Sequence, residues 1–433
     1  GRLGLLETLR QFALARLLAQ GFAEAWRRRH ADHWREVATA AWARTRSADQ
    51  LDWFERMDAD HANLRAAIEW LLEHDEPEPA GQMAAGLWWF WNTRGHVDVG
   101  LGFLRRLADR SSELSPETRC TVFTALAQLE FEGGEIDSSL GHGERAVEEA
   151  RRIGDDRLLA FALLYWANTA AHNFGLFDEA DAGYDEALEL AKGLDDAWLV
   201  AWLQLNKGWT TRLRGRYGPA AQLLESAWEG FNDRGILVGR AWAETGLGAL
   251  HAHRGELAEA ERWVRRAIDG HESLGAKGGQ IFDRSALAQI LQATDRHQEA
   301  VEQLAIARDL DEQVTRNSAL DLVSSRIFRQ AGDLRAAFES LAAEDALPPT
   351  DVFFRFELGL LAAATGLPGV AGTFLVPAKA SLDDTYEELS SISSGEFEVA
   401  MAAIEQALDG PVPTDEWLEG SADWATLAED ALH

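Results

Sequence analysis

The sequence contains a single cysteine, Cys120, in 433 residues. One thiol cannot form an internal disulfide or a structural zinc site, and its isolation fits a reducing compartment. Basic residues are also scarce, because 41 of them stand against 72 acidic residues and leave a formal net charge of -31. Such a charge repels phosphate groups, so we expect no direct contact with nucleic acid or with an anionic membrane.

Long apolar runs are missing as well. No stretch is long enough to cross a bilayer, and the first residues lack the charged, apolar and cleavage regions of a secretory signal. We therefore expect a cytoplasmic protein. With 46% hydrophobic and 26% charged residues and only 10 prolines, the chain has material for two or more ordinary domains or for one elongated array.

What the sequence does have is a repeat. Turn residues recur at spacings of 39, 41, 40, 40, 40, 37 and 34 residues, and we call them the anchors: Gly95, Gly134, Gly175, Gly215, Gly255, Asp295, Gly332 and Gly366. Small residues follow five positions after them: Gly100, Ser139, Ala180, Ala220, Ala260, Ala300, Ala337 and Ala371. Half-period turns are marked by Gly154, Gly235 and Gly275. Because glycine accepts the left-handed conformation that ends a helix, each unit is predicted to be two helices joined by a tight turn.

The segments between these turns are rich in Ala, Leu, Glu and Arg, with apolar residues every three or four positions. Strand-like alternation is absent, so we predict an all-α fold. The unit GLFDEA at 175–180, with Tyr184 and Ala187, resembles a tetratricopeptide repeat with a period near 40 instead of 34. This resemblance implies a tetratricopeptide-like right-handed superhelical solenoid of helix pairs.

Both ends have a more specific likeness. Residues 3–13 (LGLLETLRQFA), 28–34 (RRHADHW), 57–67 (MDADHANLRAA), 415–420 (DEWLEG) and 427–432 (LAEDAL) resemble parts of large bacterial signal-transduction ATPases of the STAND class. Many of these are transcriptional regulators, LuxR-type or AfsR-like, in which residues 3–6 would be the last strand of a winged helix. The resemblance implies ATPase and DNA-binding modules as partners in a parent regulator. We interpret the chain as a sensor-arm fragment, or as a family member cut down to its repeats.

The chain itself contains no G-x-x-x-x-G-K-[ST] phosphate loop and no recognisable DNA-reading helix, so we expect no ATP binding here. Three parts are predicted: a helical segment after the winged-helix end (1–75), a tetratricopeptide-like array (76–347), and looser repeats with capping helices (348–433). A loop or kinked helix is expected in the third part near Pro348, Pro349, Pro368, Pro377 and the serines at 390–394.

Catalytic patterns are missing. There is no G-x-S-x-G, H-E-x-x-H or Cys–His arrangement, and the acidic pairs fit a solvated surface, so we expect no enzyme. The pairs His30 with His33 and His251 with His253 have a spacing that points to different faces of a helix. We therefore predict no metal site and no cofactor.

The strongest candidate site is an aromatic groove. In tetratricopeptide-like stacks the first helix of each pair lines the concave wall, at about thirteen, ten, six and three residues before the anchor. This rule gives a ligand-binding set: Trp89, Gln128, Phe131, Tyr165, Thr169, His172, Trp202, Trp209, Arg212, Trp242, Phe282 and Gln289. Beside them it gives Gln82, Asn92, Thr121, Thr124, Thr245, Ser285 and Gln292. Carboxylates are nearly absent from both sets, and Arg212 can pair with a carboxylate or phosphate.

We predict a ligand-sensing region that binds a small organic effector or a peptide in this groove and thereby engages or releases the ATPase and DNA-binding modules. The alternative is a scaffold that binds a partner protein or peptide, or self-associates, with no small effector. A hydrolase hidden in the C-terminal part is a third reading. For any single Trp or Tyr, packing between repeats is as good an interpretation as ligand binding.

Overall fold

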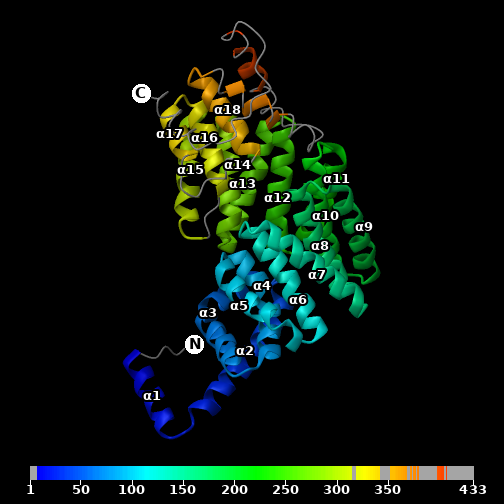
Figure 1. Cartoon of the computed structure of the whole chain (residues 1–433), viewed down its shortest axis with the longest axis vertical. Helices are drawn as coiled ribbons and strands as arrows, with labels where there is room; N and C mark the ends of the chain where they lie inside the picture. The colour runs from blue at the N-terminus through cyan, green and yellow to red at the C-terminus, as the bar shows by residue number, and fades with distance from the viewer. Residues whose placement is uncertain are drawn as a thin grey trace. The chain divides into compact units, whose positions relative to one another are not determined.

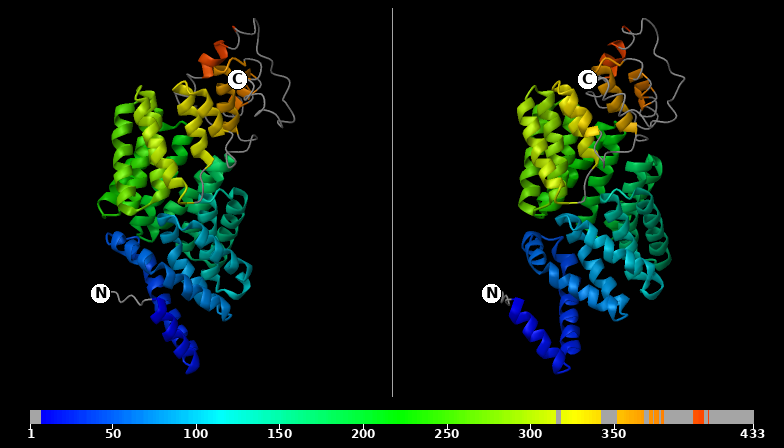
Figure 2. Two further views of the ribbon diagram at one scale, coloured as in Figure 1. Left: turned by 90° about the vertical axis from the view of Figure 1, so that its left-hand side faces the viewer. Right: turned by 60° about the vertical axis from the view of Figure 1, so that its left-hand side comes forward.

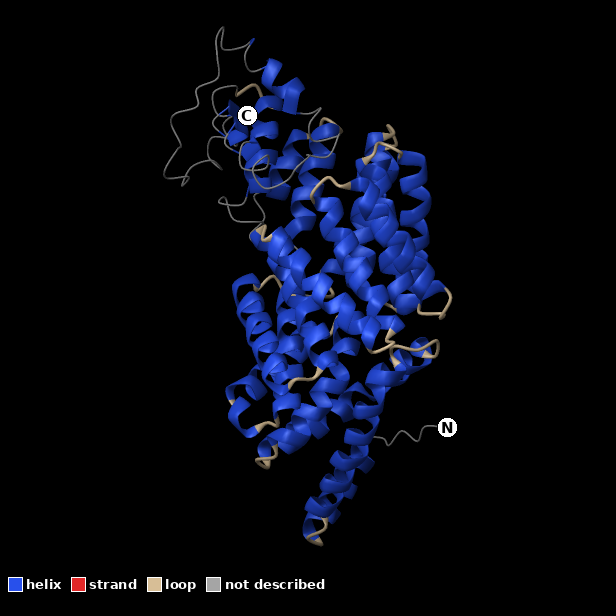
Figure 3. Cartoon of the chain, turned by 90° about the vertical axis from the view of Figure 1, so that its right-hand side faces the viewer, coloured by secondary structure: helices blue, strands red, loops and turns tan. Residues whose placement is uncertain are grey.

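The computed structural model describes residues 7–314, 318–341, 352–367, 371–372, 374–376, 378–379, 397–403 and 406. Throughout these ranges the regular elements are helices and no strand occurs (Figure 3). This confirms the all-α prediction. The strand expected at 3–6, the prolines at 348, 349, 368 and 377, the serines at 390–394 and the closing segments at 415–432 lie outside the described residues.

The chain divides into two compact units, which we describe separately. The first consists of Gly1–Asn92 and His96–Thr169, and the second of Thr93–Gly95 and Ala170–His433. The three-part division expected from the sequence stays a prediction.

The first unit is built from consecutive helices (Figure 1): α1 (Glu7–Ala19), α2 (Ala23–Arg44), α3 (Gln50–Glu73), α4 (Pro77–Arg94), α5 (Val97–Asp109), the short 3₁₀ helix η1 (Ser111–Glu113), α6 (Pro116–Glu132), α7 (Ile136–Ile153) and most of α8 (Asp156–Phe174). Helix α1 stands apart from the other helices of this unit (Figure 2). The start of α6 is fixed by Ser115, whose hydroxyl accepts from the Thr118 amide, and by Pro116 in the first turn.

The second unit continues the same pattern (Figure 1): α9 (Phe177–Gly193), α10 (Ala197–Leu213), α11 (Tyr217–Asn232), α12 (Leu237–His253), α13 (Leu257–Leu274), α14 (Lys277–Ala293), α15 (His297–Asp311), α16 (Ser318–Gln330), α17 (Leu334–Leu341) and α18 (Val352–Ala364). Consecutive helices such as α10 with α11 and α12 with α13 pack directly against each other. None of the described helices is both long enough and apolar enough to cross a bilayer.

The anchors adopt the predicted turn conformation. The backbone angle φ is positive at all of them, from 60° at Asp295 to 83° at Gly332. The half-period glycines Gly154, Gly235 and Gly275 are also left-handed, and Asp195 takes the same role between α9 and α10. The sequence therefore located both turns of the repeat correctly, because few residues tolerate this conformation.

The small residues five positions after the anchors lie in the core. Ser139 and the six alanines of this set are 0% exposed. Gly100 is more restricted still, since a Cβ atom there would lie 2.6 Å from Leu129 Cδ1 and 2.9 Å from the Trp91 ring. These positions are where neighbouring helices approach most closely, which explains why the repeat preserves small side chains there.

Candidate functional site

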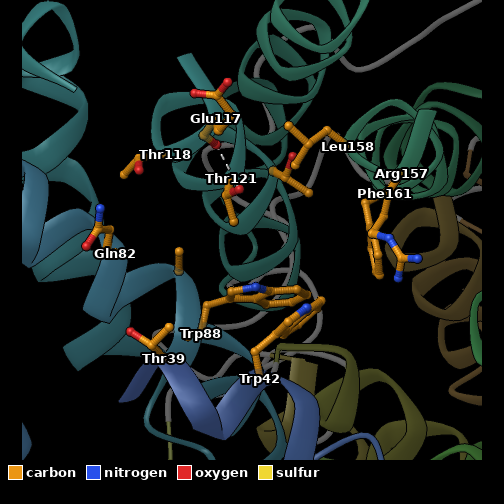
Figure 4. Close-up of a pocket in the computed structure, with 13 residues that line it drawn as sticks. Thr39, Trp42, Gln82, Trp88, Glu117, Thr118, Thr121, Arg157, Leu158 and Phe161 are labelled. Carbon is orange, nitrogen blue, oxygen red and sulfur yellow. Dashed lines mark hydrogen bonds between the residues drawn. The ribbon is translucent and has the colours of Figure 1, made fainter. Parts of the chain in front are cut away.

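The first unit contains a cavity of about 280 Å³. It is lined by residues of α2, α4, α6 and α8, shown in Figure 4: Thr39, Trp42, Gln82, Ala85, Gly86, Trp88, Glu117, Thr118, Thr121, Thr124, Arg157, Leu158 and Phe161. Gln82, Thr121 and Thr124 are among the groove positions given by the repeat. The cavity has the volume of roughly nine water molecules in the liquid, enough for a ring system of modest size.

One wall of the cavity is aromatic. The Trp42 ring centroid lies 5.5 Å from that of Trp88 and 5.4 Å from that of Phe161. Trp88 in turn meets Tyr165 edge to face at 5.4 Å, which holds the indole in place. The Arg46 guanidinium carbon lies 4.3 Å from the Trp42 ring centroid. The wall is therefore fixed before any ligand arrives, and it suits a flat apolar group.

A few polar groups interrupt the apolar lining. The Thr121 hydroxyl donates to the Glu117 carbonyl at 2.9 Å, and the Gln82 amide donates to Glu78 at 3.0 Å. The side chains of Glu117 and Arg157 are exposed and carry opposite charges. An aromatic molecule with one or two polar substituents matches such a site better than a fully charged one.

The second unit brings three predicted groove residues together. The rings of Trp209 on α10 and Phe282 on α14 meet at 5.7 Å, and Trp242 on α12 lies 6.3 Å from Phe282. Gly246 leaves room for the indole, because a Cβ atom there would lie 3.0 Å from Trp209 Nε1. Phe282 is 42% exposed. These rings form an aromatic surface on the helices that the repeat predicts for the inner wall.

A buried polar network lies next to Trp242. The His271 ring is 4.9 Å from the Trp242 ring, and His271 Nδ1 lies 2.7 Å from Asp283 Oδ2. The Thr245 hydroxyl donates to the other Asp283 oxygen, also at 2.7 Å. Both ring and carboxylate are 0% exposed. The network connects α12, α13 and α14 and fixes the helix that carries Trp242.

Two more predicted residues lie in the second unit. The Arg212 guanidinium carbon lies 4.9 Å from the Trp209 ring centroid, and the residue is 6% exposed. Gln289 accepts a hydrogen bond from Arg326 at 3.3 Å.

Several predicted groove residues are interior instead. Besides Arg212, those below one tenth exposed are Trp89, Gln128, Tyr165, Thr169 and Trp202. Trp202 packs against Trp198 at 5.6 Å and Phe231 at 5.3 Å, so it belongs to the core of the second unit. Phe131 and His172 are partly exposed. Packing between repeats accounts for the buried set, and a ligand-binding role for these residues stays a prediction.

The sequence rule missed the aromatic wall of the cavity. Trp42 lies 53 residues before the first anchor, Gly95, and the rule reaches back only about thirteen. Trp88 and Phe161 lie seven and fourteen residues before Gly95 and Gly175, positions that the rule does not include. Seven residues are close to two helical turns, so a heptad count from the anchor would have found both.

Within the described ranges, no three His, Cys, Asp or Glu side chains come together in a way that can hold a metal ion. The two histidine pairs singled out in the sequence have separate partners. His30 contacts Asn63 and His251 contacts Glu256, whereas His253 bonds the Ala249 carbonyl.

Comparison with known proteins agrees with this geometry. Residues 245–274, the end of α12 and all of α13, match the family model described as tetratricopeptide repeat. HTH-type transcriptional regulators of Mycobacterium tuberculosis and Mycobacterium bovis are 27% identical over 285 residues, covering 60% of this chain and 31% of theirs. The chain thus spans about a third of the length of the curated relatives it matches.

Solved structures with a similar fold include a Rap protein complexed with Competence and Sporulation Factor, with a TM-score of 0.55 and 15% identity over 88% of this chain and 99% of that one. NprR in complex with its cognate peptide NprX has a TM-score of 0.50 and 13% identity, over 82% and 98% of the two chains. A STAND protein with a tetratricopeptide repeat sensor from Pyrococcus horikoshii has a TM-score of 0.47 and 12% identity, over 83% and 53%. The first two likenesses agree with the fold of stacked tetratricopeptide-like helix pairs.

Proposed function

We propose that this chain is the effector-binding region of an HTH-type transcriptional regulator, and that a small planar organic molecule binds in the cavity between α2, α4, α6 and α8. The observation that carries the proposal is the preformed wall of Trp42, Trp88 and Phe161 around 280 Å³ of space. A flat apolar group placed against these rings is removed from water and gains dispersion contacts with them.

The regulator part of the proposal has a separate basis. The curated relatives are named as HTH-type transcriptional regulators, and they are about three times as long as the segment that aligns. With a net charge of -31, this chain is poorly suited to contact DNA itself. A division of labour follows, in which these repeats sense the effector and other modules, an ATPase among them, act on the promoter.

The cavity is lined by helices from four successive pairs, so a bound effector could change how these pairs pack against each other. A ligand that contacts α2, α4, α6 and α8 together favours one packing of the pairs over others. Since each pair in a repeat protein contacts its neighbours, a small rotation at each junction adds up along the stack. Effector binding would in this way alter the surface that the other modules meet.

The test is native mass spectrometry of the gently purified chain, compared with its mass under denaturing conditions. We expect a discrete excess of one small molecule per chain. The Ala85→Trp substitution fills the cavity, because Ala85 lines it, and should remove the excess. Ala43→Trp is the matched control on α2, since Ala43 is exposed and outside the lining, and should keep it.

Protein that purifies without a bound small molecule is titrated with indole and with indole-3-acetate as defined probes. The two variants are titrated in the same way. Binding that survives Ala85→Trp, or the absence of any binding to the unmodified chain, would contradict the cavity as the effector site. Equal loss in both variants would indicate damage to the fold, which circular dichroism detects independently.

A second candidate is peptide binding along the first helices of the pairs. It is favoured by the fold, which the chain shares with two proteins solved with Competence and Sporulation Factor and with the peptide NprX. A displayed library of short peptides distinguishes the candidates, because an extended peptide needs more surface than the cavity offers and should tolerate Ala85→Trp better than a small ring does.

A further inference from the structure

The second unit contains a buried cation without an acidic partner. Arg212 lies in the last turn of α10 and is 6% exposed. Two other enclosed arginines show the usual arrangement: Arg119 bonds Glu149 at 2.9 Å, and Arg284 bonds Glu272. No ion pair of the described residues includes Arg212. A buried charge that lacks a partner is costly, so this position calls for a counter-charge.

The immediate contacts of Arg212 are an aromatic ring and an imidazole. Its guanidinium carbon lies 4.9 Å from the Trp209 ring, and Nη1 lies 3.3 Å from both ring nitrogens of His253. His253 Nδ1 is 2.8 Å from the Ala249 carbonyl and must donate to it, which leaves Nε2 of the neutral ring without a proton. The Nε group of Arg212 has no hydrogen-bond partner at all. That Nε atom is itself buried, so one donor of the guanidinium fork is unpaired within the protein.

The surroundings of Arg212 are basic or neutral. His172 ends α8 as Arg212 ends α10, forty residues later, because the repeat places both three residues before an anchor. Tyr217, at the start of α11, lies beside His253 with ring centroids 6.1 Å apart. The charge interactions that shift the pKa values of these groups come from Tyr217 on Arg212 and from Arg212 on His172 and His253, and none comes from a carboxylate. In a chain with 72 acidic residues, such a gap is notable.

We propose that Arg212 anchors an anion-binding site that takes a compact oxyanion, a carboxylate or a phosphate, and that His253 takes up a proton when the anion binds. The site belongs to the second unit and is independent of the cavity in the first. The planar guanidinium offers its unpaired Nε–H for a charge-assisted hydrogen bond. Trp209, Tyr217, His172 and His253 around it are each partly exposed, and an anion would reach the buried Nε–H by displacing some of these side chains.

Proton uptake follows from the charges around the imidazole. Burial, together with the charge of Arg212, lowers the pKa of His253 to about 4, and the same causes lower the pKa of His172 to about 4. Burial likewise lowers the pKa of Arg212, to about 10. A bound anion offsets the Arg212 charge and so raises the pKa of His253. At a pH between the His253 pKa of the free protein and the higher His253 pKa of the complex, the complex holds more protons than the free protein. The affinity for the anion therefore rises as the pH falls.

The experiment uses inorganic sulfate, whose charge does not change between pH 5 and 8. Binding is followed by calorimetry and by the ring signals of isotope-labelled histidine, with His253 assigned through a His253→Gln sample. We expect affinity to increase from pH 8 to pH 5, by at most about tenfold per pH unit for each proton taken up. The His253 titration should move to higher pH in the presence of sulfate.

Arg212→Gln removes the charge and keeps most of the side-chain length. We expect at least about tenfold weaker sulfate binding, a His253 pKa that rises above about 4 without sulfate, and an unfolding midpoint that stays level or increases. Arg214→Gln is the matched control, because Arg214 is already paired with Asp178 and Asp181, and sulfate binding should be unchanged. Arg212→Lys keeps the charge without the fork and should leave the His253 pKa low while weakening sulfate binding.

Three results would overturn the proposal. The first is sulfate binding that is equal in Arg212→Gln and the unmodified chain. The second is the absence of any sulfate effect on the His253 signal throughout pH 5 to 8. The third is an Arg212→Gln chain that is folded by circular dichroism but has a lower unfolding midpoint than Arg214→Gln, since this would make Arg212 a structural residue.

Discussion

Replacing Asp283 by alanine is expected to lower the free energy of unfolding by about 3–5 kcal/mol. The carboxylate is fully buried and accepts from Thr245 while it contacts His271 Nδ1. Removing it leaves two buried polar groups without their partner and opens a cavity between α12, α13 and α14. Burial raises the pKa of Asp283, with His271 opposing that rise, so the charge depends on its neighbours for stability. Urea unfolding followed by far-ultraviolet circular dichroism measures the loss.

Asp283→Asn is the graded control for this prediction. The amide oxygen can still accept from Thr245, and the amide nitrogen can donate to His271 in its other tautomer. We therefore expect a smaller loss, about 1–2 kcal/mol. Equal losses in the two variants would mean that the ionised carboxylate is essential, whereas no loss in either would show that the network contributes nothing to the fold. Because His271 contacts Trp242, the alanine variant should also shift the tryptophan emission.

The turns of this repeat were predictable because each turn needs one residue with a positive φ, and few residue types adopt that conformation. A left-handed φ selects glycine, and in Asp295 an aspartate, so the spacing of these residues revealed the period directly. The small residues five positions later are informative for a similar reason, since close helix contact excludes larger side chains there. Together these two signals determined the fold class and the helix pairs.

The residues that line the sites were less predictable, because two residues on the same face of a helix can differ in whether a neighbouring helix covers them. Trp202 and Trp209 are two turns apart on α10 and so lie on the same side of it. Phe231 reaches Trp202 and buries it, whereas Trp209 meets the exposed Phe282. Which of the two is covered depends on residues of other helices, Phe231 on α11 and Phe282 on α14, and no pattern within α10 reports that.

The buried network was invisible in the sequence for another reason. Aspartate is mostly exposed in proteins and histidine is intermediate, and a chain with 72 acidic residues offers many aspartates like Asp283. Only the packing of α13 against α14 makes them partners. Gly279 contributes to this packing, because a Cβ atom there would lie 2.6 Å from the His271 ring.

The Gly86→Ala substitution is expected to have the largest effect per added atom, with a loss of about 3 kcal/mol, at the upper end of what overpacking costs. The added Cβ would lie 2.1 Å from the Ala38 carbonyl oxygen and 2.7 Å from the Ala38 carbonyl carbon. Both are backbone atoms of α2, so no side chain can move to relieve the contact. Helix α2 must shift away from α4, and urea unfolding should report the cost.

The same shift of α2 should weaken ligand binding in the cavity, because Thr39 and Trp42 on α2 line it together with Gly86 and Trp88 on α4. Gly102→Ala is the matched control in the same unit: Gly102 lies inside α5, is exposed, and has no atom within 4 Å of the added Cβ. There alanine should stabilise the helix by about 0.5–1 kcal/mol. Opposite signs for the two changes would show that the contact between α2 and α4, and not glycine content, sets the stability of the cavity wall. Equal signs would contradict this account of the packing.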